Sequence, residues 1–140
     1  MYNILLNAHS GLRYLILLAA AIVIIKSVIG WLGGTSYTKF DRISAPVFVG
    51  FMHLQLLLGL ILYFISPLVN YQMGEKVSRY WSAEHIAIMI LAVVAAQIGR
   101  SISKKASDDS VKFRFQTIFF GLSILLILVG LATMPGRGII

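Results

Sequence analysis

Four long apolar segments dominate this sequence and constrain what the chain can fold into. They cover about residues 4–31, 45–66, 83–100 and 115–134. Each is close to, or longer than, the roughly 20 apolar residues that a helix needs to cross a bilayer. Because 59% of the 140 residues are hydrophobic and only 12% are charged, the sequence predicts an all-α integral membrane protein. We expect one domain over residues 1–140, a four-helix bundle that runs up-down-up-down.

Local signals between these segments predict where the helices begin and end. Asp41 or Ser44 is a suitable cap for the start of the second helix, and Ser82 is a good N-cap for the third. Pro67 should end the second helix, because the residue before a proline is biased away from helical geometry. The following stretch YQMGEKVSRYW is amphipathic and aromatic, which is typical of a membrane interface.

The basic residues predict the orientation in the membrane. Eight of them fall on one side of the four predicted spans and four on the other: Lys26, Lys39, Arg42, Arg100, Lys104, Lys105, Lys112 and Arg114, against Arg13, Lys76, Arg79 and Arg137. Since cytoplasmic loops carry the excess of Lys and Arg, both termini are expected on the non-cytoplasmic side. We expect a multi-pass protein of a bacterial inner membrane. These charges sit between apolar segments, so no nucleic-acid partner is expected.

Several kinds of chemistry are excluded by residue type. The chain has no cysteine, so it has no disulfide, no thiolate metal site, no iron–sulfur cluster and no haem attached through cysteine. No serine is accompanied by both a base and an orienting carboxylate, and no loop has the P-loop ending that cradles phosphate. A self-contained hydrolase or nucleotidase is therefore not expected.

Ionisable side chains inside the predicted spans are the main functional signal. Arg at a helix centre costs about 2.5–3.5 kcal/mol on insertion scales, so such groups need a partner. With a rise of about 1.5 Å per residue, His9 and His85 lie roughly 9 and 5 Å below the same membrane face, and His53 lies roughly 10 Å deeper than His9. Arg13 is four residues after His9 and shares its helix face.

A histidine pair with a nearby arginine in a bundle interior predicts a haem b site. Two neutral imidazoles from facing helices ligate the iron, and a guanidinium suits a propionate carboxylate. We expect His9 and His85 as the axial ligands of the iron and Arg13 at a propionate. His53 is then a second-layer group, a proton or quinone contact, or a ligand if the second helix is shifted. This pattern favours an electron-transfer protein or redox accessory subunit over a self-contained enzyme.

Interpretations in which these side chains bind no cofactor stay open. A histidine near a helix end can simply reach the interface, and Arg13 can extend along its own helix to the headgroups. His53 can be a lone hydrogen-bonded histidine, with Gln97 or Gln55 as its partner.

Two other functions also stay open. One is a non-catalytic structural or assembly subunit of a larger membrane complex, whose histidines act as polar contacts between helices. The other is a copper or zinc site made by His9, His85 and Glu84, since imidazole and carboxylate suit those ions. Partners beyond the bilayer would be quinone or respiratory complex subunits. A homo-oligomer is an open alternative, because four helices leave one edge of a flat cofactor uncovered.

Three stretches resemble small four-helix bacterial membrane proteins that are labelled cytochrome b-like. They are HSGLRYLILL from His9, HLQLLLGLILYFISP from His53 and AEHIAIM around His85. With the length and the four-span layout, the resemblance covers most of the chain. It implies a b-type haem held by histidines, with His9, His53 and His85 at the matching positions. The fourth helix has no histidine, unlike larger dihaem b cytochromes, so the resemblance does not extend to a second haem.

Overall fold

The computed structural model describes residues 1–135 and is all-helical within that range. Four of its helices are long and apolar enough to cross a membrane: α1 (Tyr2–Gly33), α2 (Lys39–Ile65), a composite helix over Lys76–Lys105, and α5 (Asp109–Ala132). The composite helix consists of α3 (Lys76–Arg79), a π-helical turn η1 (Tyr80–Glu84) and α4 (His85–Lys105). The prediction of an all-α protein with four span-length helices is confirmed. Arg137, one of the basic residues counted above, lies outside the described residues.

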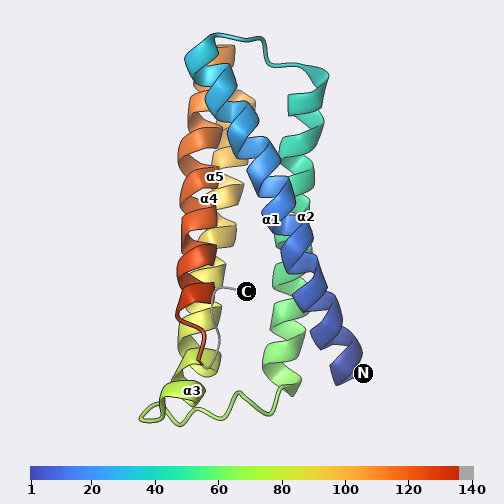
Figure 1. Ribbon diagram of the computed structural model, residues 1–140, viewed down its shortest axis with the longest axis vertical. Helices are drawn as coiled ribbons and strands as arrows, with labels where there is room; N and C mark the ends of the chain where they lie inside the picture. Colours follow the sequence, from blue (N-terminus) through green and yellow to red (C-terminus); the bar gives the residue numbers. More distant parts are fainter. Residues whose placement is uncertain (136–140) are drawn as a thin grey trace.

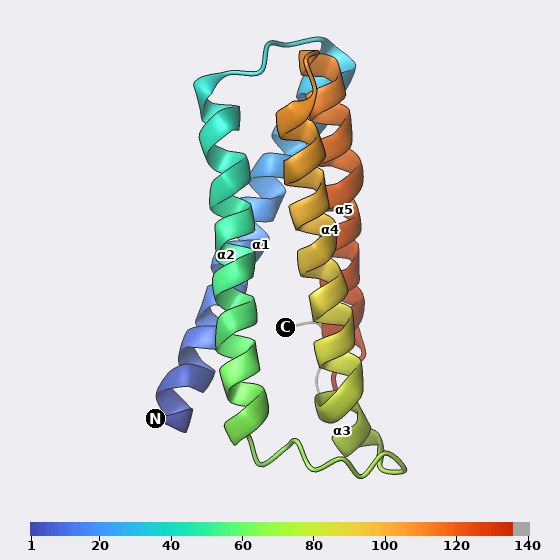
Figure 2. The same ribbon diagram turned by 180° about the vertical axis from the view of Figure 1, so that it is seen from behind.

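The four long helices form one elongated bundle (Figure 1). The α1–α2 and α4–α5 connections lie at one end, and the N-terminus and the segment between α2 and α3 lie at the other (Figures 1 and 2). Helix α1 is inclined to its neighbours. Near its C-terminal end Gly30 faces Phe113 of α5, whereas near its N-terminal end His9 faces Gly59 of α2. Helix α1 therefore lies against α5 near the α1–α2 connection and against α2 toward the opposite end (Figure 1).

Helix α2 begins six residues before the predicted position 45. Its N-cap is Thr38, and Asp41 occupies the third helical position. The Asp41 carboxylate accepts a hydrogen bond from the Thr38 backbone N–H at 2.8 Å. Asp41 therefore lies inside the helix and accepts a hydrogen bond from the backbone N–H of the N-cap residue. The expectation that Asp41 or Ser44 is itself the N-cap was wrong.

The composite helix also begins earlier than predicted, at Lys76 rather than near 83. Ser82 is not an N-cap: its hydroxyl accepts from the Tyr71 backbone N–H at 3.2 Å, and its carbonyl accepts from the Tyr63 hydroxyl at 2.7 Å. The polar residues of α3 sit at the end of the bundle, where polar side chains can reach water without ending a helix. A hydrophilic sequence was therefore mistaken for a helix boundary.

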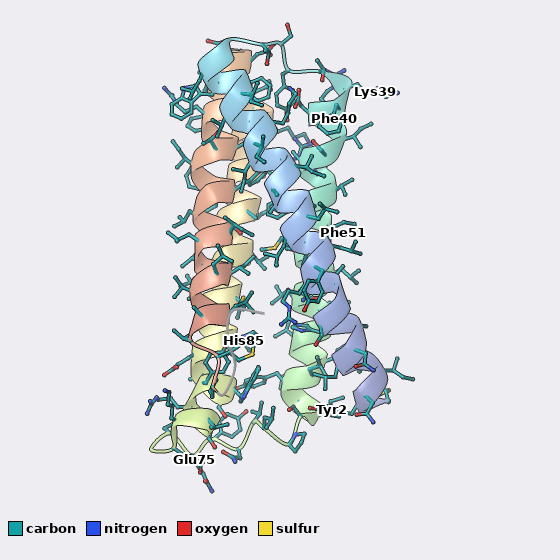
Figure 3. All side chains as sticks on the ribbon, in the orientation of Figure 1. Tyr2, Lys39, Phe40, Phe51, Glu75 and His85 are labelled. Atoms are coloured by element: carbon teal, nitrogen blue, oxygen red, sulfur yellow. The ribbon has the colours of Figure 1, made fainter. Side chains whose placement is uncertain are left out.

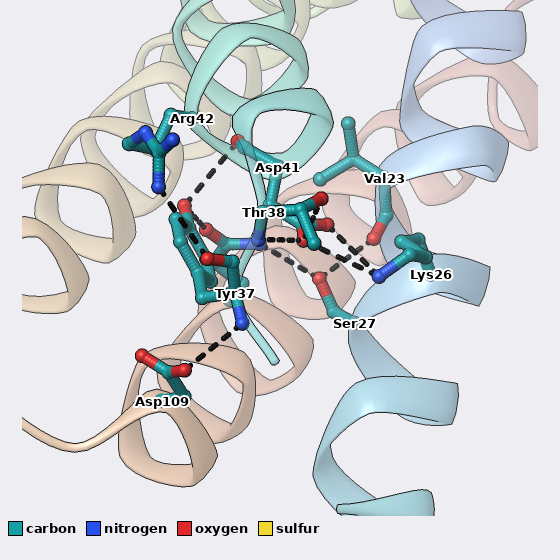
Figure 4. A network of polar contacts seen from close by, with 9 residues as sticks. Val23, Lys26, Ser27, Tyr37, Thr38, Asp41, Arg42 and Asp109 are labelled. Atoms are coloured by element: carbon teal, nitrogen blue, oxygen red, sulfur yellow. Dashed lines mark hydrogen bonds and ion pairs between the residues drawn. The ribbon is translucent and has the colours of Figure 1, made fainter. Parts of the chain in front are cut away.

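A polar network fastens the bundle at the α1–α2 connection (Figure 4). Asp41 is only 2% exposed and pairs with Lys26 at 3.2 Å. Gln116 of α5 donates to the Ser27 hydroxyl at 2.8 Å and accepts from the Tyr37 hydroxyl at 2.6 Å. These bonds connect α1, the α1–α2 connection, α2 and α5. They also satisfy polar groups that would be costly to bury alone.

The apolar core is shared by all four long helices. Small residues let the helices approach closely, as is usual in membrane bundles. At Gly99, for example, a Cβ atom would lie 2.7 Å from the Phe119 Cβ atom. The central cluster contains Leu12, Ile16, Ala20, Val23, Ala45, Phe48, Val49, Met52, Ala92, Val93, Ala96, Phe120, Ile127 and Leu131.

Candidate functional site

A cavity of about 460 Å³ lies in the half of the bundle opposite the polar network. Its walls come from the N-terminal half of α1, the C-terminal half of α2, the start of the composite helix and the end of α5. Most of the lining is apolar, and a few polar groups converge on it: Asn7, His9, Ser10, Arg13, Gln55 and His85. A volume of about 300–1,000 Å³ with such a lining is typical of small-molecule and cofactor sites. The cavity contains three of the four predicted site residues.

His9 of α1 and His85 of α4 both line this cavity, and their rings lie close together, edge to face. Their ring centroids are 6.4 Å apart and their planes differ by 61°. Two imidazoles on one metal ion have centroids about 6 Å apart, given a metal–nitrogen distance of about 2.0 Å on each side. Figure 3 shows His85 near the lower end of the bundle, at the start of α4. The separation of the two ring centroids therefore matches that of two imidazoles on one metal ion.

Two residues that line the cavity each have a buried polar atom with no hydrogen-bond partner within residues 1–135. One is Nε of Arg13, whose terminal nitrogen donates to the Tyr14 hydroxyl at 3.2 Å. The other is Oε1 of Gln55, whose Nε2 donates to the His9 backbone carbonyl at 2.7 Å. A guanidinium N–H left free beside an apolar cavity suits an anionic oxygen, such as a carboxylate. Arg13 therefore has an unpaired N–H of the kind that the predicted contact with a propionate would use.

Gly59 is a site residue that sequence reasoning missed. A Cβ atom at this position would lie 3.1 Å from His9 Nε2, so a side chain here would crowd the imidazole. The glycine keeps that side of the ring open toward α2. A glycine inside an apolar helix has many explanations, and only the position of His9 reveals this one.

The structure does not bring His53 to the other two histidines. His53 is exposed on the outside of the bundle, and its Nε2 lies 2.8 Å from the Gln97 side-chain oxygen of α4. Gln97 in turn donates to the Ser101 hydroxyl at 3.0 Å. The interpretation of His53 as hydrogen-bonded to Gln97 describes this geometry. His53 lies outside the cavity that contains His9 and His85.

A three-ligand site for copper or zinc is not assembled. Glu84 is exposed and pairs with Arg79 at 2.9 Å instead of turning toward His85. Successive residues of a helix point in directions about 100° apart, so Glu84 and His85 face different sides. Among the described residues, no three His, Cys, Asp or Glu side chains lie close enough to hold a metal ion together. The alternative of a copper or zinc site made by His9, His85 and Glu84 is therefore not supported by the structure.

Two aromatic rings lie beside His85. The Trp81 ring centroid is 5.2 Å from that of His85, and the Tyr80 centroid is 5.5 Å away. Trp81 lines the cavity. The contact of Tyr80 with His85 was missed, because a spacing of five residues does not place two side chains together on an α-helix.

Comparisons with family models, with curated proteins and with solved structures gave no match.

Proposed function

We propose that this chain is a membrane protein that binds haem b and takes part in electron transfer, as a carrier or as a redox accessory subunit. The observation that carries the proposal is the His9–His85 pair, which faces a cavity of about 460 Å³ with ring centroids 6.4 Å apart. When bound, haem b supplies a one-electron couple at its iron.

The chain's own residues have separate tasks at this site. His9 and His85 would hold the iron from opposite helices, and the unpartnered Nε of Arg13 would pair with a propionate. The apolar lining excludes water from the site. Burial and hydrogen bonds to the imidazoles then tune the reduction potential.

Absorption spectra test the proposal directly. We expect detergent-purified protein, produced with haem supplied, to show a Soret band and a sharp α band after dithionite reduction. His9→Ala and His85→Ala should weaken or abolish these bands. His53→Ala is the matched control, because it removes a histidine outside the cavity, and it should keep them. A colourless wild type, or bands that survive both cavity substitutions, would refute the proposal.

The same material tests the competing function. A non-catalytic assembly subunit would be colourless and would copurify with stoichiometric partner chains. A coloured particle that contains only this chain would argue against that role. It would also reveal whether the protein is a homo-oligomer.

The proposal includes membrane quinone as the electron partner. Its support is the outward position of His53 and Gln97, which presents a hydrogen-bonding pair on the bundle surface. Polar groups within a membrane span are costly, so an exposed pair at this depth calls for a functional explanation. His53→Leu should slow reduction of the bound haem by a quinol analogue and leave the absorption spectrum unchanged. An unchanged rate would remove quinone contact from the proposal.

We place the protein in a bacterial inner membrane, with both termini on the non-cytoplasmic side, because the distribution of basic residues favours that orientation. The chain has no cysteine, so single introduced cysteines report position without interference. An impermeant maleimide should label Asn70→Cys in spheroplasts and should label Ser36→Cys only after lysis. The reverse pattern would invert the orientation.

A further inference from the structure

The π-helical turn before His85 places one particular side chain against that histidine. Within η1 the His85 backbone N–H donates to the Tyr80 carbonyl, a bond that spans five residues. In an α-helix, two residues five apart point in directions about 140° apart. The wider turn brings them together instead: the Tyr80 hydroxyl lies 3.2 Å from Nδ1 of His85. Single π turns inside α-helices occur frequently at functional sites.

The direction of this hydrogen bond follows from the second partner of Tyr80. Its hydroxyl also lies 2.6 Å from the carbonyl oxygen of Gly130 in α5, and a carbonyl can only accept. The single hydroxyl proton therefore goes to Gly130. Because Tyr80 is only 1% exposed, its oxygen must take its remaining bond from His85, whose Nδ1 then carries the hydrogen. In a neutral imidazole this leaves the lone pair on Nε2.

We propose that Tyr80 is a positioning residue that holds His85 as the Nδ1–H tautomer and so leaves Nε2 free to ligate the haem iron. This inference rests on the proposed function for its ligand, whereas the tautomer belongs to the protein alone. A hydrogen bond to the non-ligating nitrogen fixes the ring orientation and makes the ligand more basic. His9 has no side-chain hydrogen bond in the part of the chain that the structure describes. His85 is therefore the more firmly held of the two ligands.

Nuclear magnetic resonance of the haem-free protein in micelles tests the tautomer. With nitrogen-15 in the histidines, long-range proton–nitrogen correlations should show a pyrrole-like Nδ1 and a pyridine-like Nε2 for His85. Tyr80→Phe keeps the ring and removes the hydroxyl, so it should shift His85 toward the Nε2–H tautomer. Tyr63→Phe is the matched control, because it removes a hydroxyl bond to the Ser82 carbonyl in the same π turn and does not contact His85.

Haem binding supplies the second readout. Tyr80→Phe should weaken haem affinity by about tenfold or more, as loss of such an outer partner does at metal sites. It should also raise the reduction potential, since a less basic imidazole stabilises the ferric iron less. Tyr63→Phe should leave the reduction potential unchanged, although Tyr63 also lines the cavity. Equal effects of the two variants would reduce Tyr80 to a structural role and overturn the inference.

The two proposals fail in distinguishable ways. A wild-type His85 with a pyridine-like Nδ1 overturns the inference about Tyr80, whatever haem does. A colourless protein whose His85 has a protonated Nδ1 that depends on Tyr80 supports the tautomer assignment and refutes the haem proposal.

Discussion

The contact between Gly30 and Phe113 gives the most direct test of how the bundle is packed. A Cβ atom at Gly30 would overlap the Phe113 ring. Phe113 is fully buried, and its ring lies 5.1 Å from the Tyr37 ring and 4.9 Å from the Lys26 ammonium. The ring therefore has little room to move, and Gly30→Ala must push α1 away from α5. Overpacking of this kind costs about 1–3 kcal/mol.

A second glycine separates this cost from the intrinsic helix preference of alanine. Ala is better than Gly in a helix by about 0.5–1 kcal/mol, and this gain applies equally to Gly121→Ala in α5, where a Cβ atom would meet no atom within 4 Å. The difference between the two variants therefore measures the overpacking alone. We expect Gly30→Ala to be less stable than Gly121→Ala by about 1–3 kcal/mol.

Unfolding by sodium dodecyl sulfate in mixed micelles, followed by circular dichroism, measures both variants. Adding Phe113→Leu to Gly30→Ala should cost less than Phe113→Leu costs in the wild type, because the smaller side chain relieves the overlap. Equal stability of Gly30→Ala and Gly121→Ala would refute the reasoning, since it would show that α1 and α5 do not approach as described.

Three further predictions concern the polar network and use the same unfolding assay. Lys26→Met leaves the buried Asp41 without its cation and should lower stability by about 1–3 kcal/mol, which is less than for a fully buried pair because Lys26 is partly exposed. The control is Lys39→Met at an exposed lysine, which should change stability by less than about 0.5 kcal/mol. Gln116→Leu removes both of its side-chain hydrogen bonds and should cost about 1–2 kcal/mol; an unchanged midpoint would contradict the network. Burial raises the pKa of Tyr37 above its usual range. The contribution of Tyr37 to folding stability is therefore complete below about pH 10, and it is lost as the pH rises through the folded-state pKa. Tyr37→Phe should lose less stability at alkaline pH than the wild type does. Identical pH profiles of the two proteins would contradict this role of Tyr37.

Hydrophobic length alone predicted the four span-length helices, because a run of about 20 apolar residues has few other stable conformations in lipid. The helix starts were harder. Asp41 and Ser82 both looked like caps, yet each lies inside a helix and bonds to a residue nearby. Short polar residues favour several local hydrogen bonds, and only the path of the chain decides which one forms.

Part of the candidate site could be predicted from the depth of each residue in the membrane and from the helix face that it occupies. Rise per residue placed His9 and His85 at similar depths, and the four-residue spacing placed Arg13 with His9. The contribution of Gly59 depends on the inclination of α1 against α2, which no local pattern encodes. The contact between Tyr80 and His85 depends on a π turn, which a helical periodicity of 3.6 residues does not predict.

The polar network around Asp41 also bears on how the helices associate. It joins three of the long helices at the end of the bundle remote from the cavity, through bonds made by the polypeptide alone. Association of these helices therefore depends on contacts within the chain, and none of the residues that make these contacts lines the cavity.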